Sequence, residues 1–261
     1  MNPIRSGKAE PCLHYGPLPS RASRSSIRPS KGGTRVTIVG GDPPREIRCE
    51  SDLEAKATYV FLADRDIVDV SEQPPAVTYL DGDGEPHRHT FDFLLTRRSG
   101  ERILVAIKPE ARAQAKNFRA QLRQIAAYVP KAIAQKVKLI TDADLGRDRV
   151  HDAKLIWAAR RTPDPEADAA VAVCYSDLTG AITVGDLVAR SDLKGRGFMA
   201  VVRAIANGGL TANARRIGYE TLVRAALKAP RTHDVEPTLR WGTSRERRAG
   251  IGLAAAAAPS H

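Results

Sequence analysis

The chain has 261 residues, of which 42% are hydrophobic and 27% are charged, so its composition excludes a collagen-like or wholly disordered protein. Its 41 Lys and Arg residues outnumber 30 Asp and Glu residues, which gives a formal net charge of +11. Because arginine is commoner than lysine and its planar guanidinium suits phosphate groups, the excess favours nucleic acid as a partner. A soluble basic protein without such a partner is the alternative.

The cysteines and the N-terminus bear on the cellular compartment. Cys12, Cys49 and Cys174 lie far apart and form no CxxC pair, which argues against a zinc ribbon and against a disulfide framework. No apolar run approaches the roughly 18 residues that a membrane-spanning helix needs. The basic N-terminus has the composition of a transit peptide, but its prolines would break an amphipathic helix. We therefore expect a cytoplasmic protein with no membrane partner.

Composition also divides the chain into segments. Residues 1–34 are rich in basic residues, serine, proline and glycine, and predict a disordered basic arm. Residues 162–166 combine prolines and acids between apolar stretches and predict a linker. We therefore expect an α/β domain over 35–161, a smaller helical domain over 166–228 and a disordered tail over 229–261.

Hydrophobic periodicity predicts the elements of the first domain. Ser51 and Glu54 have the spacing of a capping box, which starts a helix, and Asp81-Gly82-Asp83-Gly84 is a strong hairpin turn. The predicted strands cover 35–39, 67–70, 77–80, 89–95, 103–108 and 137–141, and the predicted helices cover 52–61, 110–128 and 150–161.

Asp92 and Lys108 lie on the two strands that a turn at Ser99-Gly100 joins. If Arg98 pairs with Arg102, Asp92 lies opposite Lys108, and both side chains share one face of the hairpin. An acid and a lysine beside a helix acid suit phosphodiester cleavage, since carboxylates bind Mg²⁺ and the lysine stabilises negative charge. An ordinary cross-strand ion pair is the alternative. The opposite face is expected to hold Phe91, Phe93, Ile103, Val105 and Ile107.

The sequence around these residues resembles the TnsA family, the endonuclease subunit of heteromeric transposases, which belongs to the PD-(D/E)XK nuclease superfamily. The similarity covers residues 48–161. It rests on Ser51–Glu54, Val70–Pro74, Thr90–Phe93 and Val105–Pro109. The resemblance implies an α/β fold with a restriction-endonuclease-like mixed-sheet core and a C-terminal helical, winged-helix-like domain.

The resemblance also implies roles for individual residues. Glu54, Asp92 and Lys108 correspond to the catalytic residues of the family, and Gln73 to its glutamine before a proline. Glu54, Asp92 and the backbone carbonyl of Ile107 would bind Mg²⁺ or Mn²⁺. Two structural alternatives stay open: Glu54 also suits the capping box, and Gln73 also suits a turn.

One position departs from the family pattern. The family usually has Glu or Gln two residues before the lysine, and this chain has Ala106. Metal binding would then rest on Glu54, Asp92, a carbonyl and water, which Mg²⁺ tolerates. The leading hypothesis is a metal-dependent endonuclease that cuts double-stranded DNA at transposon ends beside a DDE-type transposase, with an ATPase regulator as a further partner. A catalytically weak DNA-binding adaptor and a repair or restriction nuclease are the alternatives.

Basic residues predict DNA contacts in both domains. Arg112, Lys116, Arg119 and Arg123 recur with helical spacing, so they form either a phosphate-binding stripe or a solvated face. In the second domain, Thr183 is expected to cap a first helix, and a second helix follows residues 191–193. A winged helix there would use Arg203 and Arg215, together with Arg196 and Arg216, as phosphate contacts; a small helical packing domain is the alternative. His87 and His89 are expected to be solvated.

Overall fold

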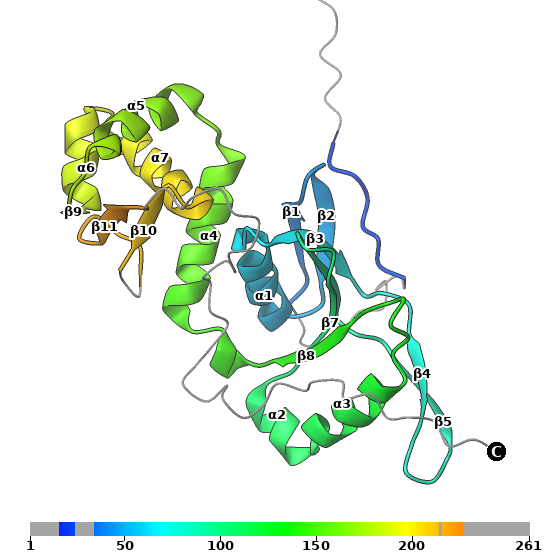
Figure 1. Ribbon diagram of the computed structural model, residues 1–261. Helices are drawn as coiled ribbons and strands as arrows, with labels where there is room; N and C mark the ends of the chain where they lie inside the picture. The colour runs from blue at the N-terminus through cyan, green and yellow to red at the C-terminus, as the bar shows by residue number, and fades with distance from the viewer. Residues whose placement is uncertain (1–15, 24–33, 214–215, 227–261) are drawn as a thin grey trace, which may run out of the picture.

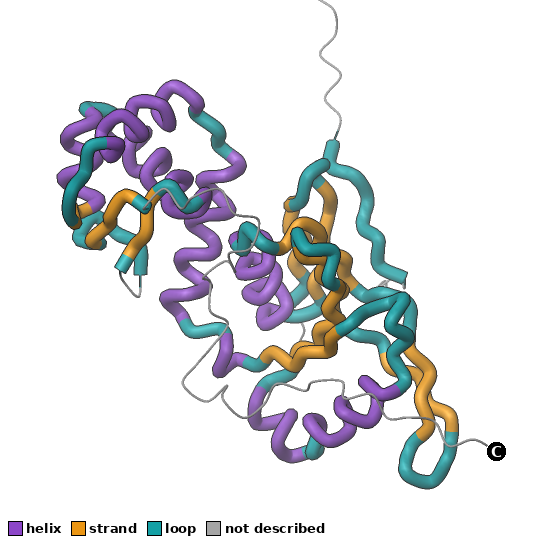
Figure 2. Tube along the Cα trace, viewed as in Figure 1, coloured by secondary structure: helices purple, strands orange, loops and turns teal. Residues whose placement is uncertain are grey.

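The computed structural model describes residues 16–23, 34–213 and 216–226, which form an α/β domain and a C-terminal domain (Figure 1). Strands gather in the first domain and helices dominate the second (Figure 2). None of the helices in these ranges is long and apolar enough to cross a membrane. The predicted tail over 229–261 lies outside the described residues.

A four-stranded mixed sheet forms the centre of the α/β domain. Its strands are ordered β3 (Ile67–Glu72), β6 (Phe93–Arg97), β7 (Arg102–Ile107) and β8 (Lys136–Ile140). The first three strands are antiparallel, and β8 runs parallel to β7. The predicted α/β class and mixed sheet are therefore confirmed.

Helices cover both faces of this sheet (Figure 1). One face packs against α1 (Asp52–Ala63) and α4 (Arg147–Arg161), and the other against α2 (Glu110–Ala115) and α3 (Phe118–Ala127). Successive side chains of β7 alternate between the two cores: Val105 belongs to the α1 side, and Leu104 to the α3 side. Because both faces are covered, the end of β7 is held rigidly.

Two hairpins extend the domain. The first joins β1 (Val36–Gly40) to β2 (Arg45–Cys49), and the second joins β4 (Val77–Leu80) to β5 (Pro86–His89). The second hairpin projects beyond α3 (Figure 1). Its turn is confirmed, since Asp81 Oδ1 accepts hydrogen bonds from the backbone of Asp83 and Glu85, both at 2.9 Å.

Two predicted elements are divided in the structure. The strand predicted over 89–95 ends at His89 and resumes at Phe93, because the chain bends between two sheets there. The helix predicted over 110–128 is broken at Asn117, whose φ of +45° lies in the left-handed region that asparagine tolerates. The four predicted basic residues therefore belong to two helices and the junction between them.

Residues 18–23, which we call the strap, pack against the α/β domain. The Leu18 N–H donates to Pro44 O at 2.9 Å, and the Ser23 N–H donates to Gln73 O at 3.0 Å. Arg21 forms an ion pair with Asp69 at 2.9 Å. The prediction of a disordered arm over 1–34 is therefore wrong for these residues, because backbone pairing with distant strands orders them.

The C-terminal domain contains α5 (Pro165–Ser176), β9 (Ala181–Thr183), α6 (Val184–Ser191), α7 (Lys194–Asn207), β10 (Leu210–Ala212) and β11 (Leu222–Ala225). Its strands form an antiparallel sheet in the order β10, β11, β9. Thr183 caps α6 as predicted, with its hydroxyl accepting from the Asp186 N–H at 3.0 Å. The winged-helix assignment stays a prediction.

The predicted linker over 162–166 is short and tightly held. Asp164 caps α5 by accepting a hydrogen bond from the Ala167 N–H at 3.1 Å, and it also binds Arg196 of α7 at 2.8 Å. Ala159 of α4 and Val202 of α7 are both fully buried in a cluster that joins the domains. Helix α4 therefore contributes to both domains.

Candidate active site

Three strand ends meet at one end of the sheet. The Gln73 N–H, just after β3, donates to Asp92 O at 2.8 Å. The Asp92 N–H donates to Val105 O of β7 at 2.9 Å. The backbone bonds therefore place Asp92 between the end of β3 and the end of β7, where Lys108 follows.

The register of β6 and β7 differs from the predicted one. Thr96, not Arg98, pairs with Arg102, and Phe93 pairs with Val105. The turn closes at Arg97, whose N–H donates to Glu101 O at 2.9 Å. The pair that closes the turn therefore lies one residue earlier on each strand than the predicted pair of Arg98 and Arg102. The prediction that Asp92 lies directly opposite Lys108 is therefore wrong. Phe91 was also placed on the wrong face, because the bend at residue 92 turns it into the α3 core.

The Asp92 carboxylate takes the place of a backbone acceptor. Its Oδ2 atom accepts a hydrogen bond of 2.6 Å from the Ile107 N–H, where β6 has bent away from β7. A charge-assisted bond of this kind fixes the orientation of the carboxylate. Asp92 is thereby held beside Ile107, the residue whose carbonyl is the predicted metal ligand.

Lys108 lies on the α3 side of the sheet end. Its N–H donates to Ile140 O at 3.1 Å, and its Nζ lies 4.5 Å from the centroid of the Phe118 ring. His89 is near it, since burial and then the charge of Lys108 lower the pKa of the imidazole. The expectation of solvation is therefore wrong for His89, which packs edge-on against Phe91, whereas His87 is exposed and bonds Asp81 at 2.7 Å.

Glu54 carries out the structural role that its position predicts. Ser51 Oγ accepts from the Glu54 N–H at 3.2 Å and donates to Glu54 Oε1 at 2.8 Å. Glu54 Oε2 accepts from the Glu50 N–H at 2.8 Å. Both carboxylate oxygens thus serve the N-terminus of α1, in a variant of the capping box. A role in catalysis stays a prediction.

Glu72, the last residue of β3, is an acid that sequence reasoning did not select as a site residue. It is fully buried, and Ser20 Oγ of the strap donates a hydrogen bond to its Oε1 atom. Burial raises the pKa of the neighbouring Cys49 thiol to about 12; the hydroxyl of Thr58 lowers it, and the charges of Glu54 and Glu72 raise it further. Both carboxylates therefore lie near Cys49.

Gln73 contributes its backbone to this arrangement. It is 2% exposed, and its φ of +43° lies in the left-handed region. Its N–H bonds Asp92 O, and its carbonyl accepts from the Ser23 N–H. Gln73 therefore links the strap, β3 and Asp92, and a role for its side chain stays a prediction.

The position that usually holds the family's Glu or Gln is closed. Ala106 is 2% exposed and packs in the same apolar cluster as Leu104 and Phe118. In the described ranges, no group of three or more His, Cys, Asp or Glu side chains could hold a metal ion. Mg²⁺, however, keeps several waters and needs only one or two carboxylates. The Asp92 carboxylate, fixed beside Ile107, fits such a sparse site.

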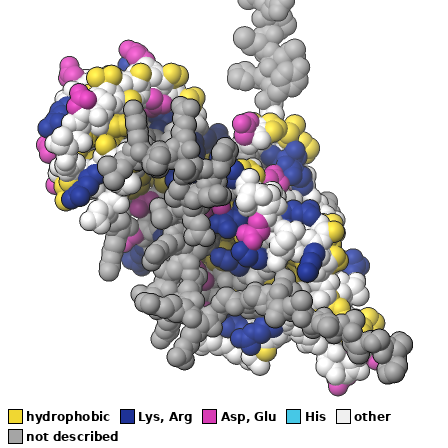
Figure 3. All heavy atoms as spheres, viewed as in Figure 1, with side chains coloured by type: hydrophobic (Ala, Val, Ile, Leu, Met, Phe, Trp, Pro, Cys, Tyr) yellow, Lys and Arg dark blue, Asp and Glu magenta, His cyan; other side chains and the backbone are white. Residues whose placement is uncertain are grey.

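The predicted DNA contacts divide into exposed and internal residues. Arg112, Lys116, Arg119 and Arg123 are all exposed. Arg119 binds Glu110 at 2.8 Å, and bonds from Gln114 and Arg119 lower the pKa of that carboxyl. On the face shown in Figure 3, Lys and Arg side chains recur across the α/β domain.

Arg203 is not a surface residue. It is 6% exposed, and its guanidinium donates to Asp168 Oδ1 at 2.7 Å and to Thr162 O at 2.8 Å. Arg203 therefore joins α7 to the end of α4, and its DNA contact stays a prediction that this burial does not favour. Arg196 is exposed but binds Asp164 and Glu166, both at 2.8 Å. Arg215 lies outside the described residues.

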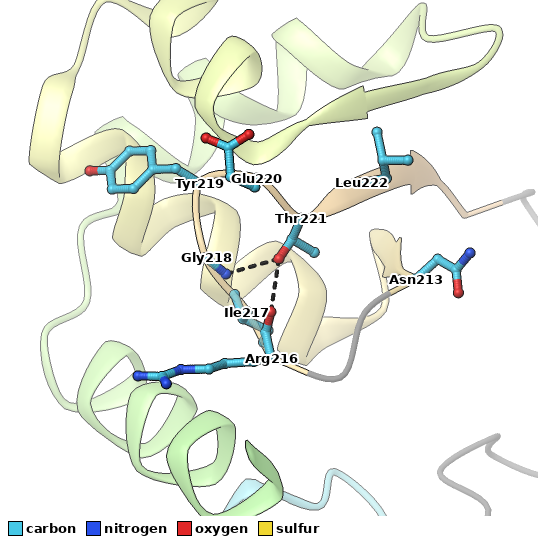
Figure 4. A pocket seen from close by; sticks show the side chains of 8 residues that line it. All are labelled: Asn213, Arg216, Ile217, Gly218, Tyr219, Glu220, Thr221 and Leu222. Atoms are coloured by element: carbon cyan, nitrogen blue, oxygen red, sulfur yellow. Dashed lines mark hydrogen bonds between the residues drawn. The ribbon is translucent and has the colours of Figure 1, made fainter. Parts of the chain in front are cut away.

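A hollow of about 420 Å³ lies in the C-terminal domain beside the loop between β10 and β11 (Figure 4). Thr221 Oγ1 closes this loop by donating to Arg216 O at 3.0 Å and accepting from the Gly218 N–H at 2.9 Å. None of the predicted catalytic residues lines it. The candidate site is therefore the end of the sheet and not this hollow.

Comparison with known families supports the end of the sheet as the candidate active site. Residues 64–141 match the family model described as TnsA-like endonuclease N terminal. No curated protein matches the sequence. The matched segment runs from the end of α1 through β8 and includes Asp92 and Lys108, whereas Glu54 precedes it. The mixed sheet with helices on both faces is consistent with the restriction-endonuclease-like fold expected for this family.

Proposed function

We propose, from the premise that this chain carries a TnsA-like endonuclease domain, that it is a metal-dependent endonuclease subunit that cuts DNA at transposon ends beside a DDE-type transposase. The observation that carries the proposal is the bond from the Ile107 N–H to Asp92 Oδ2, at 2.6 Å. It fixes the Asp92 carboxylate beside Ile107, the residue that precedes Lys108, within the segment that matches the family.

Asp92 and the Ile107 carbonyl would hold Mg²⁺ or Mn²⁺, with Glu54 as a further acid. A divalent cation there would supply Lewis-acid stabilisation of the phosphodiester and lower the pKa of the attacking water. The bond from the Ile107 N–H orients Asp92 without help from a cation. The site therefore depends on the bend that separates Asp92 from the regular pairing of β6.

Lys108 would stabilise the negative charge that develops on the scissile phosphate. Its ammonium lies against the Phe118 ring, so part of its surroundings is apolar rather than aqueous. A preorganised charge acts more strongly where water is partly excluded. Lys108 would also be placed to give a proton to the leaving oxygen from its Nζ atom.

Double-stranded DNA would approach along α2 and α3. Helix α2 begins at Glu110, two residues after Lys108, and Arg112, Lys116 and Arg123 are exposed nearby in the sequence. Such side chains bind phosphates irrespective of base sequence. A transposase subunit and an ATPase regulator, in the cytoplasm, are the partners that accompany this proposal.

Ala106 favours a second candidate, a DNA-binding adaptor without nuclease activity. Its methyl group adds no ligand, and it is buried in the α3 core. An adaptor would use the exposed basic residues and would not need Asp92 or Lys108. DNA affinity would then fall with salt, with a slope of about −0.9 per phosphate contacted, while no strand is cut.

Plasmid cleavage with Mg²⁺ and with Mn²⁺ tests the choice. We expect the wild type to nick or linearise the plasmid, Asp92→Ala to abolish the reaction, and Lys108→Ala to slow it roughly 10²–10³-fold. Lys131→Ala, at an exposed site outside the sheet end, is the matched control and should cleave normally. Wild-type protein that binds DNA but cuts it with neither metal would favour the adaptor.

A further inference from the structure

Glu72 differs from the other acids at the sheet end in how its carboxylate is satisfied. It is 0% exposed, and its Oε2 atom has no hydrogen-bond partner among the described residues. The hydrogen bond to Oε1 comes from the hydroxyl of Ser20, a neutral donor. The carboxylate is thus buried with little to balance its charge.

An ionised carboxylate in this position needs a counter-charge. Removing an ionised carboxyl from water costs several kcal/mol unless it is paired or binds a metal. Glu54, whose charge also reaches Cys49, is a second carboxylate near the same thiol, so the local charge is more negative still. These surroundings favour a bound cation.

Glu72 is also adjacent to the candidate catalytic acid. It pairs with Phe93 across β3 and β6, and the next residue, Gln73, bonds the backbone of Asp92 at 2.8 Å. On β7, Ala106 stands where the family usually has an acid or amide, while the neighbouring strand β3 ends in Glu72. One strand thus lacks a ligand where its neighbour offers one.

We propose that Glu72 is a further ligand of the divalent cation, supplied by β3 at a sheet end where Ala106 of β7 supplies none. This rests on the proposed function, because the cation is the one that the nuclease would use. Two acids from neighbouring strands, Glu72 and Asp92, match the one or two carboxylates that Mg²⁺ takes from proteins. Ser20 would then hold the Glu72 carboxylate in place and cover it from solvent.

The test is cation binding by the full chain without DNA, so that it does not depend on cleavage. Mn²⁺ is titrated by calorimetry, and thermal unfolding is followed with and without Mn²⁺. We expect Glu72→Gln to weaken Mn²⁺ binding at least roughly tenfold, because even the loss of an outer-sphere partner has an effect of that size. The Mn²⁺-induced rise in Tm should be lost as well. The matched control is Asp69→Asn, which removes an acid of the same strand and a strap contact, and should bind Mn²⁺ as the wild type does.

A second variant covers the case in which Glu72→Gln does not fold. Ser20→Ala removes the donor that holds Glu72 in place, so the Mn²⁺-induced rise in Tm should be smaller than in the wild type, and an unchanged rise would count against Glu72 as a ligand. If Glu72→Gln binds Mn²⁺ normally while Asp92→Asn does not, the inference is overturned and the proposed nuclease stands. A wild type that binds no Mn²⁺ overturns the inference as well, whatever the plasmid assay shows.

Discussion

The sheet end and the junction between the domains both bury charged side chains, but they satisfy them differently. At the junction, Arg203 bonds a carboxylate and two backbone carbonyls, and Asp164 bonds both a helix N-terminus and Arg196. At the sheet end, Glu72 has a single neutral donor among the described residues. Each group keeps one buried atom without a hydrogen bond among the described residues, Arg203 Nη2 and Glu72 Oε2, but Arg203 has a carboxylate partner there and Glu72 has only a hydroxyl. Glu72 is therefore the better candidate for a binding function.

The largest effect should come from breaking the junction. Arg203→Ala breaks bonds to three partners at once and removes the guanidinium donor of the Thr162 carbonyl, whereas the Ala159 carbonyl still accepts from the N–H and hydroxyl of Thr162. We expect a loss of about 2–3 kcal/mol in the free energy of unfolding, measured by urea denaturation. DNA affinity, compared at one salt concentration, should not change. A stable variant with weakened DNA binding would return Arg203 to the predicted phosphate contacts.

Ala106→Glu tests whether the buried position at Ala106 can accept a carboxylate that reaches the cation. A carboxylate at this 2% exposed position would enter the apolar cluster of Leu104 and Phe118, which should cost about 2 kcal/mol or more of stability without Mn²⁺. If the new carboxylate reaches the cation, Mn²⁺ should restore part of that loss. Ala106→Gln is the neutral control. A variant as stable as the wild type in chelator would show that this face is open to solvent.

Glu54 combines a cap with a predicted catalytic role, and two substitutions can separate them. Glu54→Ala removes acceptors for Ser51 and Glu50 and should destabilise the fold by about 1 kcal/mol. Glu54→Gln keeps one acceptor oxygen and should retain most of the stability. If both variants lose cleavage, Glu54 has a catalytic role. If only the destabilised Glu54→Ala variant loses cleavage, Glu54 acts as a helix cap alone.

The smallest effect should be the pH dependence that His89 contributes. Burial and Lys108 lower its folded-state pKa below the ordinary value of 6.5, so the folded protein favours the neutral imidazole. This contribution is present above pH 6.5 and is lost as the pH falls through the folded-state pKa. Urea denaturation at pH 7.5 and 5.5 should show a smaller loss for His89→Gln than for the wild type. Equal losses would place His89 in water.

The elements were largely predictable because their signals are local. The capping box of Ser51 and Glu54 and the hairpin turn after Leu80 each depend on residues within a few positions. The helix break at Asn117 was not predicted, because one residue in the left-handed region leaves the spacing of the basic residues in the sequence unchanged. The gap between β5 and β6 was missed because alternation continues through Asp92 although the backbone bends.

The site was predictable only in part, because its remaining features depend on contacts between distant segments. Asp92 and Lys108 carry a family pattern that can be read in sequence, even though the predicted register was one residue out on each strand. The buried Glu72 carboxylate is bonded by Ser20, 52 positions earlier. Arg203 is internal because the end of α4 turns back onto α7, 41 positions away. No local pattern carries either fact.

Helix α4 couples the stability of the two domains, because it packs into both of them. Val150 and Ala153 pack in the core with α1, while Ala159 packs against Val202 of α7. Loosening either domain would therefore strip apolar contacts from the helix that supports the other. The two domains should melt in one cooperative transition, and a cut within residues 162–164 should leave an apolar stripe of α4 in water, making the separated α/β domain prone to self-association.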